Sequence, residues 1–167
     1  MIIVLTYTGV FIIIPIYGVD CFIQIGFDRY EAGGLGFHSG AAVIPVIASN
    51  GIQNAYLFME SSLTHLLGHH LTLEDIKANV ILGSDVHFAP TEVIALENTL
   101  NGTIFPQDEI IAISEFAHSN GVKMHLDGAR IWHVAAETGV PLTELCAPFD
   151  SVSLCFSKGL GMFLIGQ

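Results

Sequence analysis

The half of the chain from residue 92 to residue 157 alternates short apolar stretches with stretches of helical spacing. The apolar stretches are EVIALEN (92–98), VKMHL (122–126) and SVSLCFS (151–157). The stretches between them are PQDEIIAISEFAHS, which ends at Asn120-Gly121, and ARIWHVAAET, which ends at Gly139. This order of strand, helix, strand, helix and strand predicts an α/β fold, in which a mostly parallel sheet is joined by right-handed helical crossovers.

Three shorter patterns precede this half. The glycine-rich stretch EAGGLGFHSGAA (31–42) indicates a loop with tight turns, and AVIPVIA (42–48) indicates a short buried strand that SNG closes. The stretch LTLEDIKANV (71–80) is typical of an amphipathic helix. Thr72 and Asp75 have the spacing of a capping box, which marks the start of that helix.

The balance of charges excludes one class of partner. The chain has 5 basic and 16 acidic residues, which gives a formal net charge of −11. Five scattered basic residues cannot build the positive patch that nucleic-acid binding needs, so we expect no nucleic-acid partner. The three cysteines show no CxxC spacing, which favours a reducing compartment and predicts a cytoplasmic protein.

The first 19 residues, MIIVLTYTGVFIIIPIYGV, contain no charged side chain. One interpretation is a membrane-spanning anchor, which would make this a small membrane protein. Against it, no basic residue precedes the apolar run, Pro15 interrupts the run, and its many β-branched residues favour a strand over a helix. We therefore expect a buried segment, or one that a truncated or mis-spliced gene has added to the protein, rather than a membrane span.

Polar residues follow three of the predicted strands, where the functional residues of parallel sheets gather. These pairs are Glu97-Asn98, Asp127-Gly128 and Ser157-Lys158. Asp127 and Lys158 could form an ion pair that only caps the sheet. Alternatively they could serve pyridoxal phosphate (PLP), which needs an amine for its aldehyde and a carboxylate beside its pyridine nitrogen. Asp127 lies 31 residues before Lys158, which suffices for one crossover, and a partly desolvated lysine at a strand end would be a competent amine.

Two motifs carry a resemblance to a known family. The stretches HLDGARIWHVAAETGVPLTEL (125–145) and FDSVSLCFSKGLG (149–161) resemble the low-specificity threonine aldolases. These belong to the β-eliminating lyase and threonine aldolase superfamily of fold-type-I PLP enzymes. The similarity continues upstream through HFAPTEVIALENT (87–99), LTLEDI (71–76) and YEAGGLGFHSGAAVIPV (30–46). DGAR and SKGLG at this separation form a specific combination, whereas either alone would be a weak signal.

The resemblance implies roles for individual residues. It makes Lys158 the Schiff-base lysine and pairs Asp127 with the pyridinium nitrogen of PLP. Arg130 would help to hold the cofactor or the substrate near the ring, and Ser157 would contact the cofactor. Three further residues are candidates for contact with the substrate or for support of the site: Glu31, Glu97 and Asn98.

The reaction implied by the resemblance is retro-aldol cleavage of a β-hydroxy amino acid, such as threonine, to glycine and an aldehyde. The partner would be a small amino-acid substrate, and the family implies a homo-oligomer whose active sites form at subunit interfaces. The sequence does not choose among threonine, allo-threonine and other β-hydroxy substrates. It also does not separate cleavage from the related β-elimination.

The chain departs from the family pattern at several positions that are expected to form the cofactor site. The phosphate-binding turn expected near the N-terminus has no counterpart in residues 1–29, where Thr8-Gly9 lies inside an apolar run. Gly26 stands where the family carries a histidine before YEAGG, and Leu100 and Asn101 stand where another follows ENT. These departures leave open a second hypothesis, a catalytically inactive remnant that associates with a full-length homologue.

Further departures divide the chain into segments. Residues 52–70 separate SNG from LTLEDI, and residues 162–167 diverge after SKGLG. We expect the small C-terminal domain of the family to be absent. We therefore predict a partial PLP-dependent large domain over 30–161, with 52–70 as an insert and with 1–29 and 162–167 outside the family pattern. His65 and His69 in the insert have i, i+4 spacing but lack a nearby acidic or cysteine partner, so we predict no metal site.

Overall fold

A computed structural model of the chain describes residues 41–46, 48–49, 70–83, 85–100 and 102–161, and the backbone of 20–24. Several predictions from the sequence lie outside these residues. They concern Glu31, most of segment 1–29, nearly all of the insert 52–70, and the end at 162–167. Within the described part, no helix is both long and apolar enough to cross a membrane.

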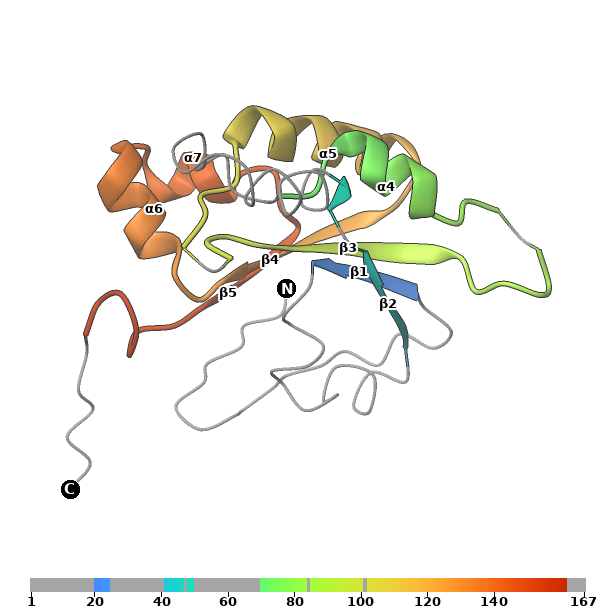
Figure 1. Ribbon diagram of the computed structural model, residues 1–167, viewed down its shortest axis with the longest axis horizontal. Coiled ribbons are helices and arrows are strands. Elements are labelled where there is room, and N and C mark those ends of the chain that lie inside the picture. Colours follow the sequence, from blue (N-terminus) through green and yellow to red (C-terminus); the bar gives the residue numbers. More distant parts are fainter. Residues whose placement is uncertain are drawn as a thin grey trace, which may run out of the picture.

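The described strands form one parallel sheet of five strands in the order β2-β1-β3-β4-β5. The strands are β1 (Asp20–Gln24), β2 (Ala42–Val46), β3 (Thr91–Glu97), β4 (Lys123–Gly128) and β5 (Ser151–Leu154). The described helices are α4 (Leu73–Asn79), α5 (Gln107–Ser119), α6 (Ile131–Thr138) and α7 (Leu142–Cys146). All four helices lie on one face of the sheet (Figure 1), and the predicted α/β fold is confirmed.

Local sequence explains where these helices begin and end. Thr72 and Asp75 form the predicted capping box at the start of α4, with Asp75 Oδ2 accepting the Thr72 N–H at 2.9 Å. Pro106 precedes α5, and the acidic pair Asp108 and Glu109 in its first turn complements the positive end of the helix dipole. Each predicted helix is therefore present, with ends within a few residues of those expected.

The hydrophobic core lies between the sheet and the helices. Alternate residues of β3 and β4 point toward the helices, because successive side chains of a strand face opposite sides. One buried cluster joins β2, β3 and β4 to α4 and α5, and includes Ile76, Ile94, Leu96, Ile113 and Met124. A second joins β4 to α6 and α7, and includes Leu126, Ile131, Val134 and Leu145. The remaining residues of β3 and β4, among them Glu97 and Asp127, face the other side of the sheet.

The strand predicted as buried over 42–48 is β2, and it is only partly buried. Ala42 and Pro45 are exposed, whereas Val46 is buried. The reason is topological, because β2 is the edge strand of the described sheet and lies beside one neighbouring strand only.

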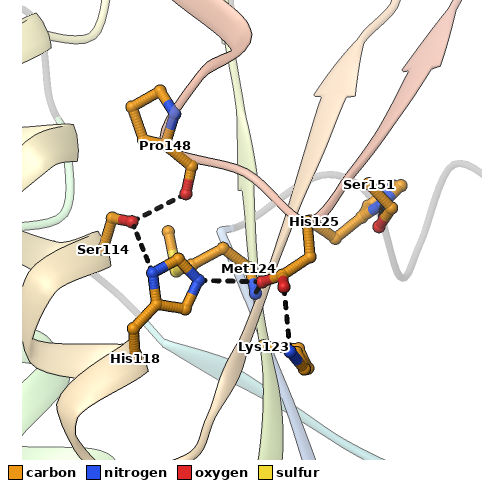
Figure 2. Close-up of polar contacts among 8 residues, drawn as sticks. Ser114, His118, Lys123, Met124, His125, Pro148 and Ser151 are labelled. Atoms are coloured by element: carbon orange, nitrogen blue, oxygen red, sulfur yellow. Dashed lines mark hydrogen bonds and ion pairs between the residues drawn. The ribbon is translucent and has the colours of Figure 1, made fainter. Parts of the chain in front are cut away.

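Asp150 connects the end of α5 with the starts of β4 and β5. It lies at the amino ends of these strands, opposite to the carboxyl ends. Its carboxylate accepts a hydrogen bond from the backbone N–H of Met124 at 2.8 Å and one from Lys123 Nζ at 3.0 Å. His118 Nε2 lies 2.9 Å from the same carboxylate, and Figure 2 shows His118, Lys123 and Met124 converging there. Burial acts to raise the pKa of Asp150, but these hydrogen bonds outweigh it and lower the pKa to about 2.

This junction predicts a loss of stability in acid. Because the pKa of Asp150 in the folded chain is about 2, below its ordinary value of 3.8, its contribution is complete above pH 3.8 and is lost as the pH falls toward 2. We expect Asp150→Ala to lower the free energy of unfolding by about 1–2 kcal/mol at pH 7, a modest value because the carboxylate is partly exposed. The difference from wild type should shrink toward zero near pH 2.

Urea unfolding at several pH values measures this effect. Glu137→Ala serves as the control, since Glu137 is an exposed residue of α6, and its replacement should change the free energy of unfolding by less than about 0.5 kcal/mol. A difference between Asp150→Ala and wild type that stays constant from pH 7 to pH 2 would contradict the assignment.

Candidate active site

Charged side chains gather at the carboxyl ends of β3, β4 and β5. Glu97 and Asp127 are partners in the register of neighbouring parallel strands, so their side chains leave the same face of the sheet. Arg130 follows at the start of α6, and Lys158 follows β5 by four residues. Asp127, Arg130 and Lys158 all lie close enough to Glu97 for their charges to act on it. The structure thus brings together four of the residues that the sequence singled out.

Asp127 is held firmly at the end of β4. Its Oδ1 accepts the backbone N–H of Ala129 at 2.9 Å, and its carbonyl oxygen accepts the N–H of Asn98 at 3.2 Å. No described residue donates to its Oδ2. A Cβ on the following residue, Gly128, would lie 2.8 Å from the carbonyl oxygen of Ser153. Glycine therefore permits the close approach of β4 to β5 beside this carboxylate.

Glu97 is a largely buried carboxyl with only weak support from nearby positive charge. Its side chain is 15% exposed, and the nearest cation is Arg130, whose Nη1 lies 3.9 Å from Glu97 Oε1. Burial and the negative charge of Asp127 raise the pKa of Glu97 to about 7, against the opposing effect of the positive charges of Arg130 and Lys158. Near neutral pH this carboxyl can therefore both hold and release a proton.

Lys158 lies in a turn rather than at the end of a strand. The strand predicted over 151–157 ends at Leu154, and Lys158 is exposed. Its carbonyl oxygen accepts the N–H of Gly161 at 3.0 Å and closes the turn. The expectation of a partly desolvated amine is thus wrong for the described structure, because the chain leaves the sheet three residues before the lysine.

Trp132 holds the segment between β5 and Lys158 against α6, a role that the sequence did not reveal. Its Nε1 donates to the carbonyl oxygen of Cys155 at 3.1 Å, and its ring lies 6.2 Å from that of Phe156. A Cβ on Gly159 would lie 3.0 Å from the ring of His133 and 3.1 Å from Trp132. The glycine after Lys158 is therefore required for close contact with α6, and the order SKG was the one signal of it in the sequence.

The other candidate residues are placed as follows. Ser157 is exposed in the turn beside Lys158. Asn98 is almost fully buried, and its Oδ1 accepts the N–H of Phe105 at 3.1 Å, so its side chain supports the loop after β3. His125 shares the face of Asp127, and its Nδ1 lies 2.8 Å from Ser151 Oγ. Burial lowers the pKa of His125 and outweighs the opposing charge of Asp127, which favours the neutral ring.

The comparison with known proteins identifies the family of this chain. A family model of beta-eliminating lyases matches residues 21–166. The chain belongs to the beta-eliminating lyase family. The low-specificity L-threonine aldolase of Candida albicans is 44% identical to it over 149 residues, which cover 88% of this chain and 35% of the relative. This family member thus spans about a third of the length of the curated relatives it matches.

Solved structures share its fold. A candidate L-allo-threonine aldolase from Listeria monocytogenes superimposes with a TM-score of 0.61 at 24% identity, covering 85% of this chain and 34% of that one. The PLP-bound C-S lyase from Staphylococcus hominis superimposes with a TM-score of 0.52 at 11% identity, covering 84% of this chain and 32% of that one. At these identities the likeness concerns the fold, which is that of the PLP enzymes predicted from the sequence.

The described residues fit two groups of PLP, its aldehyde and its pyridine nitrogen. An accessible amine on Lys158 suits the aldehyde, and Oδ2 of Asp127, to which no described residue donates, suits a protonated pyridine nitrogen. Arg130, whose side chain is 48% exposed, can present its guanidinium to an anionic group. Within the described ranges, no group of His, Cys, Asp and Glu side chains could hold a metal ion.

Proposed function

We propose that this chain carries part of the active site of a PLP-dependent lyase that cleaves a β-hydroxy amino acid, such as threonine, to glycine and an aldehyde. The observation that carries the proposal is the gathering of Asp127, Arg130 and Lys158 around Glu97 at the carboxyl edge of a parallel sheet. The relative from Candida albicans, a low-specificity L-threonine aldolase, supports the choice of reaction. When bound, PLP supplies an electron sink for the electron pair that remains on the substrate after bond cleavage.

Each residue has a separate task in this proposal. Lys158 offers its amine to the aldehyde of the cofactor, from an exposed turn that Trp132 fixes against α6. Asp127 holds a proton on the pyridine nitrogen through Oδ2, because Ala129 already occupies Oδ1. Arg130 binds a carboxylate or phosphate oxygen through its forked donors. The predicted contacts of Ser157, Glu31 and Asn98 with cofactor or substrate stay predictions.

The test is release of acetaldehyde and glycine from L-threonine by the purified chain with added PLP. Asp127→Asn should lower the rate by about 100-fold or more, because the amide cannot stabilise a positive pyridine nitrogen as a carboxylate does. Glu137→Gln removes an exposed negative charge on α6 and should leave the rate unchanged. If wild type binds PLP but forms no acetaldehyde, the lyase proposal fails, and the inactive remnant predicted as the alternative is favoured.

The partner and the location are also proposals. A small amino-acid substrate follows from the same relatives, while the homo-oligomer and the cytoplasmic location rest on the family resemblance and on the cysteine pattern. Measuring the mass of the purified chain in solution and separating cell fractions test these two expectations.

A further inference from the structure

Glu97 is a charged residue of the site for which the proposed function has no task. It is the last residue of β3 and the register partner of Asp127 on β4. Neighbouring strands of a sheet lie about 4.8 Å apart, so the two side chains leave the sheet next to each other, and Asp127 lies close enough for its charge to act on Glu97. Two carboxylates at such a separation do not both ionise readily in a partly buried place.

The surroundings decide which of the two carboxyl groups takes the proton. Asp127 accepts a backbone hydrogen bond from Ala129 at 2.9 Å, which favours its charged form. In the part of the chain that the structure describes, no donor hydrogen-bonds to Glu97. Arg130, its nearest cation, lies at 3.9 Å and is half exposed to water. The unsupported carboxyl of Glu97 is therefore the better place for the proton.

The described charged groups around Glu97 come from β4 and from the two segments that follow it along the chain at this end of the sheet. They are Asp127 on β4, Arg130 at the start of α6, and Lys158 in the turn after β5. On its other side β3 pairs with β1, which contributes Ile23 beside Ala95 and ends at Gln24. Ile23 and Gln24 carry no titratable group, so among the described residues the charge on Glu97 is governed by Asp127, Arg130 and Lys158.

We propose that Glu97 carries the single proton of a Glu97–Asp127 carboxyl pair, and thereby leaves Asp127 as the one negative charge that faces the cofactor nitrogen. Glu97 is then a positioning residue that acts through Asp127. The second half of this inference rests on the proposed function, whereas the first half concerns the chain alone. The raised pKa of Glu97, about 7, agrees with the geometry and places loss of this proton near neutral pH.

The first experiment uses the chain without cofactor. Carboxyl ¹³C NMR should show one glutamate that titrates near pH 7 and disappears in Glu97→Gln. Glu92→Gln is the matched control, because Glu92 is an exposed residue of the same strand, and the signal should persist there. Asp127→Asn should move the midpoint to lower pH, since it removes the neighbouring negative charge. A Glu97 midpoint near its ordinary value of 4.5 would overturn the inference.

The second experiment adds PLP and follows the visible absorption of the bound cofactor between pH 5.5 and pH 8.5. Wild type and Glu92→Gln should show a spectral transition near pH 7, which Glu97→Gln should lose. An unchanged transition in Glu97→Gln would overturn the effect on the cofactor. If no variant forms a visible band, the proposed function fails, and with it the effect on the cofactor, while the NMR midpoint still decides whether the carboxyl pair exists.

Discussion

Replacing Lys158 with alanine is expected to abolish the visible absorption band that the chain forms with PLP. The same change should lower any cleavage of threonine by about a thousandfold or more, because the amine that holds the cofactor aldehyde is lost. Lys158 is exposed, so its removal leaves no cavity, and Glu97 keeps Arg130 as its nearest cation. Circular dichroism and urea unfolding should therefore show a folded chain with unchanged stability, which separates a loss of chemistry from a loss of structure.

Two control variants make this result specific. Lys158→Arg keeps the positive charge beside Glu97 but removes the primary amine, and it should also lose the band. Lys77→Ala removes a surface lysine of α4 that pairs with Glu74 at 3.1 Å, and it should retain the band in full. A band that survives in Lys158→Ala would mean that another amine binds the aldehyde, and it would remove Lys158 from the proposed site.

The second half of the fold could be predicted because its signals are local. Apolar strands of four to seven residues alternate with helices whose limits are marked by proline, asparagine or glycine. The capping box of Thr72 and Asp75 spans only four consecutive residues, and Asn120-Gly121 marks the end of α5. Parallel pairing then follows, because each crossover contains a helix. Glu97 and Asp127 were predicted at one edge for the same reason.

Features that depend on distant contacts could not be predicted. β1 lies inside the sheet between β2 and β3, and strand order depends on packing that no local pattern encodes. After β5 ends at Leu154, Trp132 holds Cys155 beside α6 through a hydrogen bond across 23 residues of sequence. The raised pKa of Glu97 depends on burial and on the register with Asp127. In each case the deciding partner is distant in the sequence.

Replacing Ile94 with alanine is expected to lower the free energy of unfolding by about 2–5 kcal/mol. Ile94 is fully buried in the middle of β3, where it packs with Met124 and with α5 residues such as Ile113. Truncation removes three methyl or methylene groups from contact and leaves a cavity that a sheet paired on both sides cannot easily close. A domain of this size is stable by about 5–15 kcal/mol, so the loss is a large part of the total and urea unfolding resolves it readily.

Ile111→Ala tests whether burial, rather than the chemical change, causes this loss. Ile111 lies on α5 with 43% of its surface exposed, and alanine favours the helix, so the expected change is within about 0.5 kcal/mol. Equal losses at both positions would mean that β3 is not packed beneath α5. Because β3 ends in Glu97, the packing of Ile94 also helps to fix the position of the Glu97 carboxyl relative to Asp127. Ile94→Val, which removes one methylene group at a cost of about 1 kcal/mol, should therefore keep the chain folded and leave the Glu97 titration near pH 7.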